Sequence, residues 1–211
     1  MEEEFTGTHT QRVKQNVEEL YNKGVEHIMK SMGKVSIDYF STIRYLWCSE
    51  NAVAFYNKYA DSLVQAINQG VADIITICKK VEDAHNIYAR VNGSELVSVE
   101  THPYRLLGLP NFYDNLNGVR GMNVNEVKYQ TNMFKLFMNS LLSQLDDLPI
   151  TIDIFDPNKD QLLTYRNMLN TVIERIRTQF DNIVTDIELA ESTEEDKIQL
   201  TKEYAIEVLN N

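Results

Sequence analysis

The sequence predicts an all-α protein, in which elongated antiparallel helical hairpins form a four-helix bundle with a short C-terminal helix. Three observations predict this fold class. The 211 residues include only 8 glycines and 4 prolines, so few turns interrupt the chain and its helices must be long. Apolar residues recur at intervals of three and four, as they do on one face of a helix. Hydrophobic residues make up 43% of the chain, which is enough for a real core at this length.

The first hairpin is expected within residues 1–92. Apolar stripes mark one helix over residues 10–46 and another over residues 49–91, and the short sequence Leu46-Trp47-Cys48-Ser49 joins them. Ser49 can cap the second helix, because serine oxygens accept hydrogen bonds from backbone N–H groups of the first turn. Two long helices with so short a connection must lie antiparallel to bury both stripes.

Residues 93–123 are expected to form an irregular connector. His102-Pro103, Gly108 and Pro110 interrupt any helical period. The segment is rich in leucine, tyrosine and phenylalanine, so we expect it to pack on the helices rather than to be a solvated linker. A short helix is expected over residues 110–116.

A second hairpin is expected within residues 124–190, with its first helix over residues 124–147. Asp156-Pro157 is a typical helix start, with aspartate as the N-cap and proline in the first turn. The sequence Ser192-Thr193-Glu194-Glu195 matches a capping box, which predicts that a separate acidic C-terminal helix occupies residues 191–211.

Charge is concentrated at the two ends of the chain. The formal net charge is −11, and residues 181–211 alone carry nine acidic and two basic side chains. The sequence has no cluster of lysine and arginine, so we expect no nucleic-acid partner and no attraction to an anionic membrane. No stretch is long and apolar enough to predict a membrane span. The acidic start, Met1 to Thr6, predicts a protein made in the cytoplasm without a Sec-type signal peptide.

The best enzymatic candidate is the pair Glu82 and His85, which are three residues apart on a predicted helix. A di-iron bundle needs two such pairs and two further glutamates. No other histidine has a glutamate three residues before it, so we interpret His85 as a surface or half-buried residue. Phosphate-binding glycine loops and nucleophile-elbow sequences are also absent. We therefore expect no enzymatic activity, no metal and no cofactor.

The two cysteines, Cys48 and Cys78, are interpreted as small apolar packing residues. Cys78 lies far along the second helix, roughly 40 Å from the turn at 1.5 Å per residue, so a disulfide between them is not expected. Cys48 lies in the turn itself, where we expect enough exposure for its thiol to react.

The turn has a wider sequence context. Leu46, Trp47 and Ser49 precede Ala52 and Phe55, and the helix that follows closes with Ala84 and Tyr88. Over residues 10–92 this pattern resembles the Trp-X-Gly (WXG, ESAT-like) family of type VII secretion proteins, as a tandem or double-length variant. Ser49 stands where the family has glycine. The family's export signal places an acidic residue four positions after a tyrosine, whereas Tyr204 is followed there by Val208.

The resemblance implies a non-enzymatic protein that acts by helix–helix protein binding, as a secreted substrate, a chaperone or an adaptor. It implies partner-binding roles for Trp47, Ser49, Phe55 and Tyr88. The implied partner is a helical protein or the secretion machinery, with secretion or display at the cell surface. Residues 124–190 would act as a built-in second hairpin, an intrachain pseudo-dimer, unless the protein forms homo-oligomers. From the residues alone, Trp47 is equally well interpreted as a plug of the hairpin end, and the alternative function is an unrelated helical scaffold or assembly subunit.

Overall fold

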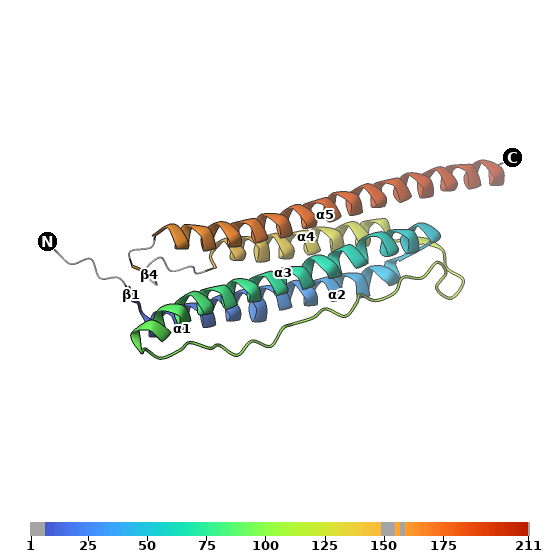
Figure 1. The fold of residues 1–211 in the computed structure, drawn as a ribbon. Helices are drawn as coiled ribbons and strands as arrows, with labels where there is room; N and C mark the ends of the chain where they lie inside the picture. The colour runs from blue at the N-terminus through green and yellow to red at the C-terminus, as the bar shows by residue number, and fades with distance from the viewer. Residues whose placement is uncertain (1–6, 149–154, 157–158, 211) are drawn as a thin grey trace. The chain divides into compact units, whose positions relative to one another are not determined.

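The computed structural model of the chain describes residues 7–148, 155–156 and 159–210. Within these residues the protein is all-α and 80% helical, and four helices pack antiparallel, which confirms the predicted fold class at this level (Figure 1). The first of the four is a run of three helical segments that follow one another without a break. The helical elements are α1 (Thr10–Tyr21), η1 (Asn22–Met29), α2 (Lys30–Leu46), α3 (Glu50–Asn92), α4 (Val124–Asp146) and α5 (Lys159–Asn210).

Short strands add two antiparallel pairings to the helices. β1 (Gly7–Thr8) pairs with β4 (Phe155–Asp156), and β2 (Trp47–Cys48) pairs with β3 (Gly121–Met122). The expectation that Asp156 caps a helix is therefore wrong, because Asp156 lies in β4 and α5 begins only at Lys159. Pro157, which was expected in the first turn of that helix, lies outside the described residues.

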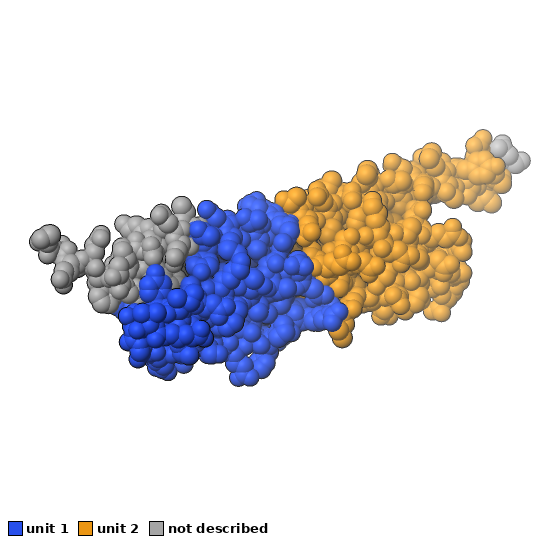
Figure 2. All heavy atoms as spheres, viewed as in Figure 1, with its two compact units in different colours: residues 1–32, 67–106, 141–177 blue, residues 33–66, 107–140, 178–211 orange. Residues whose placement is uncertain are grey.

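The chain divides into two compact units (Figure 2). By residue range, each unit contains pieces of every long helix. Unit 1 contains residues 1–32, 67–106 and 141–177. Unit 2 contains the remaining segments, which are residues 33–66, 107–140 and 178–211. Each unit thus includes part of both hairpins that the sequence predicts.

The middle of the first helical run, η1, is π-helical, whereas the sequence predicts a regular helix. Buried positions in this region recur every four residues rather than every 3.6. A regular α-helix rotates such a stripe steadily off its buried face, and a segment with the wider turns of a π-helix rotates it back. The buried residues are Leu20, Tyr21, Gly24, Val25, Ile28 and Met29.

Glycines allow a close approach of helices in unit 1. A Cβ atom at Gly70 of α3 would lie 2.9 Å from Ile176 Cδ1 of α5 and 3.0 Å from Met29 Sδ of η1. A Cβ atom at Gly24 would lie 3.1 Å from Ile74 Cγ2 of α3. A side chain at either position would force these neighbouring side chains to shift, so glycine permits the packing seen there.

The connector packs on the helices, as predicted. In unit 1 its first part, residues 93–106, is held by asparagine side chains of α3 that bond its backbone. Asn86 accepts a hydrogen bond from Val97 N–H and donates one to Val97 O, both at 2.8 Å. Asn68 does the same for Leu106, at 2.8 and 2.9 Å. Each amide therefore satisfies both backbone groups of one residue, as a neighbouring strand would.

We expect Asn86→Ala to destabilise unit 1 by about 1–3 kcal/mol, because it leaves the N–H and C=O of Val97 without their partners. Chemical denaturation would measure the free energy of unfolding, and hydrogen exchange at Val97 would report the local effect. Asn57→Ala, at an exposed position of the same helix, is the matched control. Equal stability of the two variants would show that the amide does not hold the connector.

The short helix expected over residues 110–116 is wrong. In unit 2 this part of the connector contains no helix, and Leu116 exchanges both of its backbone hydrogen bonds with Val119 around a tight turn. Gly118 in that turn has φ +84°, which glycine adopts easily. The backbone groups of Leu116 are thus used across the turn and cannot serve a helix.

The prediction of a separate C-terminal helix over residues 191–211 is also wrong, because α5 continues without a break to Asn210. The hydroxyl of Thr193 donates to the carbonyl of Leu189, four residues back, at 2.8 Å. The Thr193 side chain of the predicted capping box thus bonds to the preceding turn of α5 instead of capping a new helix. Glu191 is buried on the same face of α5 as Ile187, four residues earlier. The buried face of α5 therefore continues through the capping-box sequence.

Candidate protein-binding site

The turn between α2 and α3 is fixed on several sides in unit 2. β2 pairs with β3, and Asn123 N–H donates to Leu46 O at 2.8 Å. Ser49 Oγ accepts a hydrogen bond from Ala52 N–H at 3.1 Å, which confirms that Ser49 can cap α3. These hydrogen bonds therefore hold the turn in one ordered conformation.

Trp47 forms part of a cluster of aromatic rings behind this turn. Its side chain is 1% exposed, and its ring centroid lies 5.4 Å from that of Phe55. Phe112 of the connector joins the cluster, at 6.1 Å from Phe55. The indole N–H of Trp47 is buried and has no hydrogen-bond partner among the described residues. The burial of the ring thus outweighs the cost of an unpaired donor, about 1–3 kcal/mol.

The structure brings three of the four predicted partner-binding residues together. Trp47, Ser49 and Phe55 all lie at the turn in unit 2, with Trp47 and Phe55 buried and Ser49 half-buried. Tyr88 belongs to unit 1, where it is half-buried on α3. It lines a groove of about 590 Å³ between α3 and α5, together with Ala84, Ile87, Tyr165 and Met168.

The sequence did not reveal a concentration of exposed apolar side chains at the end of α5. Every residue from 199 to 210, a segment named the α5 end below, is exposed. Leu200 and Tyr204 are 66% and 69% exposed and lie one helical turn apart. Ile206, Val208 and Leu209 are also exposed. The signal for this surface is the set of apolar residues at helical spacing within the acidic C-terminal segment, such as Leu200, Tyr204 and Val208.

A groove separates the first part of this helical segment from the Trp47 turn in unit 2. Its volume is about 700 Å³. Ile198 and Ala205 of α5 form one wall, and the opposite wall comes from the end of α2, from β2 and from the connector. That opposite wall contains Tyr45, Leu46, Cys48, Val119 and Met122. The groove, named the α5 groove below, is thus lined mainly by apolar side chains.

A buried carboxyl group lies on α5 just before this groove. Glu191 is 4% exposed and accepts a hydrogen bond from Thr131 Oγ1 of α4, and Thr131 is 2.9 Å from Tyr39 Oη of α2. Burial raises the pKa of Glu191 to about 7, and the negative charge of Glu188 adds to the rise. The hydrogen bond from Thr131 and the charge of Lys128 act in the opposite direction.

Glu191 lies between two ion pairs that join α4 and α5. One ion pair lies on each side of it along the helix, and in each a lysine of α4 faces a glutamate of α5. At the intermediate position α4 presents threonine instead of lysine, so this one carboxyl lacks a cationic partner in direct contact. The pairs are Lys128 with Glu195 and Lys135 with Glu188.

Both cysteines are free and buried, which corrects the expectation that Cys48 is exposed enough to react. The reason is that Cys48 lies in β2, against the connector, rather than at the tip of an open turn. Burial raises the pKa of the Cys48 thiol, and burial together with the charge of Glu82 raises the pKa of Cys78 to about 12. Neither thiol is therefore activated as a nucleophile.

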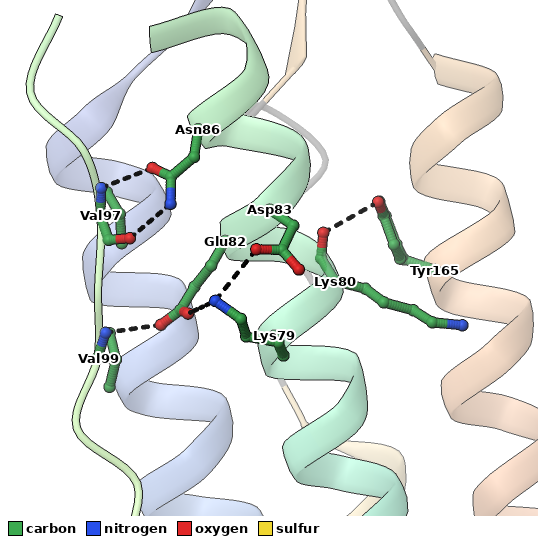
Figure 3. Close-up of polar contacts among 8 residues, drawn as sticks. All are labelled: Lys79, Lys80, Glu82, Asp83, Asn86, Val97, Val99 and Tyr165. Carbon is green, nitrogen blue, oxygen red and sulfur yellow. Dashed lines mark hydrogen bonds and ion pairs between the residues drawn. The ribbon is translucent and has the colours of Figure 1, made fainter. Parts of the chain in front are cut away.

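The Glu82 and His85 pair has a structural role in unit 1. Glu82 accepts a hydrogen bond from Val99 N–H at 2.6 Å, and its other oxygen lies 3.4 Å from Lys79 Nζ (Figure 3). His85 is fully buried, which corrects the expectation of a surface or half-buried residue, and its Nε2 lies 3.4 Å from Glu95 O. The pair therefore faces the connector, and no group of three or more potential metal ligands occurs among the described residues.

Comparison with protein-family models, with curated proteins and with solved structures finds no match for this chain. The resemblance to the Trp-X-Gly family therefore rests on the residues around the turn. None of the described helices combines the length and the apolar character that a bilayer crossing requires.

Proposed function

We propose that this protein is a non-enzymatic helical protein of a type VII-like secretion pathway, which acts as a secreted substrate, a chaperone or an adaptor. In this proposal it works by helix–helix binding to another protein. The observation that carries the proposal is the α5 end, where five large apolar side chains lie exposed on a helix beside an apolar groove.

An exposed apolar surface of this kind is typical of a protein-binding site. Five large apolar residues within the last eleven positions of a helix are more than scattered surface residues, which need no explanation. A partner helix packed on the α5 end would remove part of this apolar surface from water.

The four residues that the resemblance implies would then act in two ways. Trp47 and Phe55 are buried, so they would shape the wall behind the turn without touching the partner. Ser49 and Tyr88 are half-buried and remain accessible to direct contact. Secretion, or display at the cell surface, is part of the proposal and follows from the family resemblance.

The alternative is a helical scaffold or assembly subunit that has no connection with secretion. Val208 at the position where the family's export signal has an acidic residue, and Ser49 in place of glycine, favour this second candidate. Both candidates use the same exposed surface. They differ in whether the captured partner belongs to a secretion system and whether the protein leaves the cell.

Affinity capture from the cells that make the protein tests the proposal. The wild-type chain is expected to retain a helical partner or a secretion ATPase, and Leu200→Ser with Tyr204→Ser is expected to lose most of it. Leu107→Ser removes a similarly exposed leucine from the connector and serves as the matched control. A chain that captures no partner, stays monomeric and never leaves the cell would contradict the proposed function.

A further inference from the structure

We infer that the α5 groove binds an amphipathic helix whose apolar stripe is flanked by aspartate or glutamate. The inference rests on the proposed function, because it names the chemistry of the partner at the groove beside the α5 end. Its basis is the combination of apolar walls with exposed cations at a groove on an otherwise acidic protein.

The charge of the groove has the opposite sign to that of the chain. The chain carries a net charge of −11, whereas the charged side chains that line the groove are three basic and one acidic. The acidic one, Glu194, is buried and accepts a hydrogen bond from Asn51 Nδ2 at 2.5 Å. The basic ones are Arg120, Lys197 and Lys202.

These cations are available to an incoming ligand. Lys197 and Lys202 are exposed, and neither forms an ion pair within the described part of the chain. Arg120 is also exposed, and within the described residues it forms one ion pair, with Glu50 at 4.0 Å, the edge of ion-pair distance. Carboxylates of a partner would therefore meet the free charges of Lys197 and Lys202 on the α5 wall, and Arg120, at the edge of ion-pair distance from Glu50, on the opposite wall.

The dimensions of the groove favour a helix over a compact small molecule. Its α5 wall extends from Glu194 to Ala205, which spans roughly 17 Å at the rise of an α-helix. That length corresponds to about three helical turns. A helix that buries one apolar stripe against such a wall is a common mode of peptide recognition.

The charges also exclude a second copy and an anionic membrane as the preferred occupants. The outer side of the α5 end carries Glu203 and Glu207. If a second copy presented this side to the groove, its own Lys202 would compete with the groove cations for these two carboxylates. An anionic lipid surface would be repelled by the net charge of the chain. A separate acidic helix meets the same overall repulsion, but it can enter the groove and meet the local cations there.

Two synthetic peptides of about 18 residues test the inference. They share one apolar stripe at helical spacing and differ only in their flanking residues, which are glutamate in one and lysine in the other. Fluorescence anisotropy with the full chain is expected to show that the glutamate peptide binds and that its affinity falls as the salt concentration rises. The lysine peptide is expected to bind less tightly, although the net charge of the protein favours it.

Charge reversal in the groove supplies the decisive comparison. Lys197→Glu with Lys202→Glu is expected to weaken binding of the glutamate peptide at least about tenfold and to tighten binding of the lysine peptide. Lys14→Glu with Lys34→Glu changes the net charge equally at exposed positions outside the groove, and it is expected to bind as the wild type does.

Three outcomes would overturn the inference. They are equal or tighter binding of the lysine peptide to the wild type, binding of the glutamate peptide that survives the groove reversal, and no binding of either peptide. Each of these leaves the capture experiment above unaffected, since a partner of other chemistry would still depend on Leu200 and Tyr204. A failed capture with a positive peptide result would instead contradict the proposed cellular function alone.

Discussion

Trp47→Ala is expected to lower the free energy of unfolding by about 3–5 kcal/mol, as is typical when a large buried aromatic side chain is truncated. The ring is almost fully buried and contacts Phe55 in the aromatic cluster behind the turn, so its loss would leave a cavity that the rigid turn cannot fill. Denaturant titration followed by circular dichroism measures the effect, and the melting temperature should fall by about 10 °C.

Trp47→Phe is the matched control for this prediction. Phenylalanine keeps most of the aromatic volume and removes only an N–H that has no partner among the described residues, so we expect a loss below about 1.5 kcal/mol. A Trp47→Ala variant that loses a captured partner while its stability stays within about 0.5 kcal/mol of the wild type would contradict the packing role. It would show instead that the ring itself recognises the partner.

Glu191→Gln is expected to stabilise the protein above neutral pH by about 3 kcal/mol and to have little effect near pH 4.5. Burial raises the pKa of Glu191 from 4.5 to about 7, so the folded state favours the protonated form. The stability that this proton contributes is complete below pH 4.5 and is lost as the pH rises through 7. A difference of about 2.5 pKa units corresponds to about 3 kcal/mol.

The measurement is the free energy of unfolding of both proteins between pH 4.5 and 8.5. The difference between them isolates Glu191, because the other carboxylates are common to both. Glu188→Gln changes a neighbouring, largely exposed carboxylate and should shift stability by less than about 1 kcal/mol at any pH. A difference between Glu191→Gln and the wild type that does not change with pH would contradict a raised pKa.

The sequence predicted the long helices well because their stripes are strong local signals. The α3 helix, for example, begins one residue after the predicted cap at Ser49 and ends at Asn92, one residue beyond the predicted Val91. The π-helical segment η1 was missed, although the four-residue spacing of pairs such as Gly24 and Ile28 was visible. Intervals of four agree with an α-helix over one turn, and only their repetition over several turns distinguishes the two.

The end of α5 was misread for a related reason. Ser192 begins a sequence that matches a capping box, and Glu191 before it looks like a break in the apolar stripe. Tertiary packing decides otherwise, because Thr131 accommodates the Glu191 carboxyl inside unit 2 and the helix continues. The sequence did not predict the hydrogen bonds from Asn68 and Asn86 to the connector, because no local pattern indicates that an asparagine will bond a distant backbone segment.

The α5 end as a protein-binding surface is the central claim, and site-specific photo-crosslinking tests it most directly. A benzophenone amino acid in place of Tyr204, introduced in the cells that make the protein, should form a covalent adduct with a second polypeptide. The same group in place of Asn57, exposed on α3, should not form that adduct. Recovery of the chain from position 204 without any crosslinked partner, or with the same partners as from position 57, would contradict the claim.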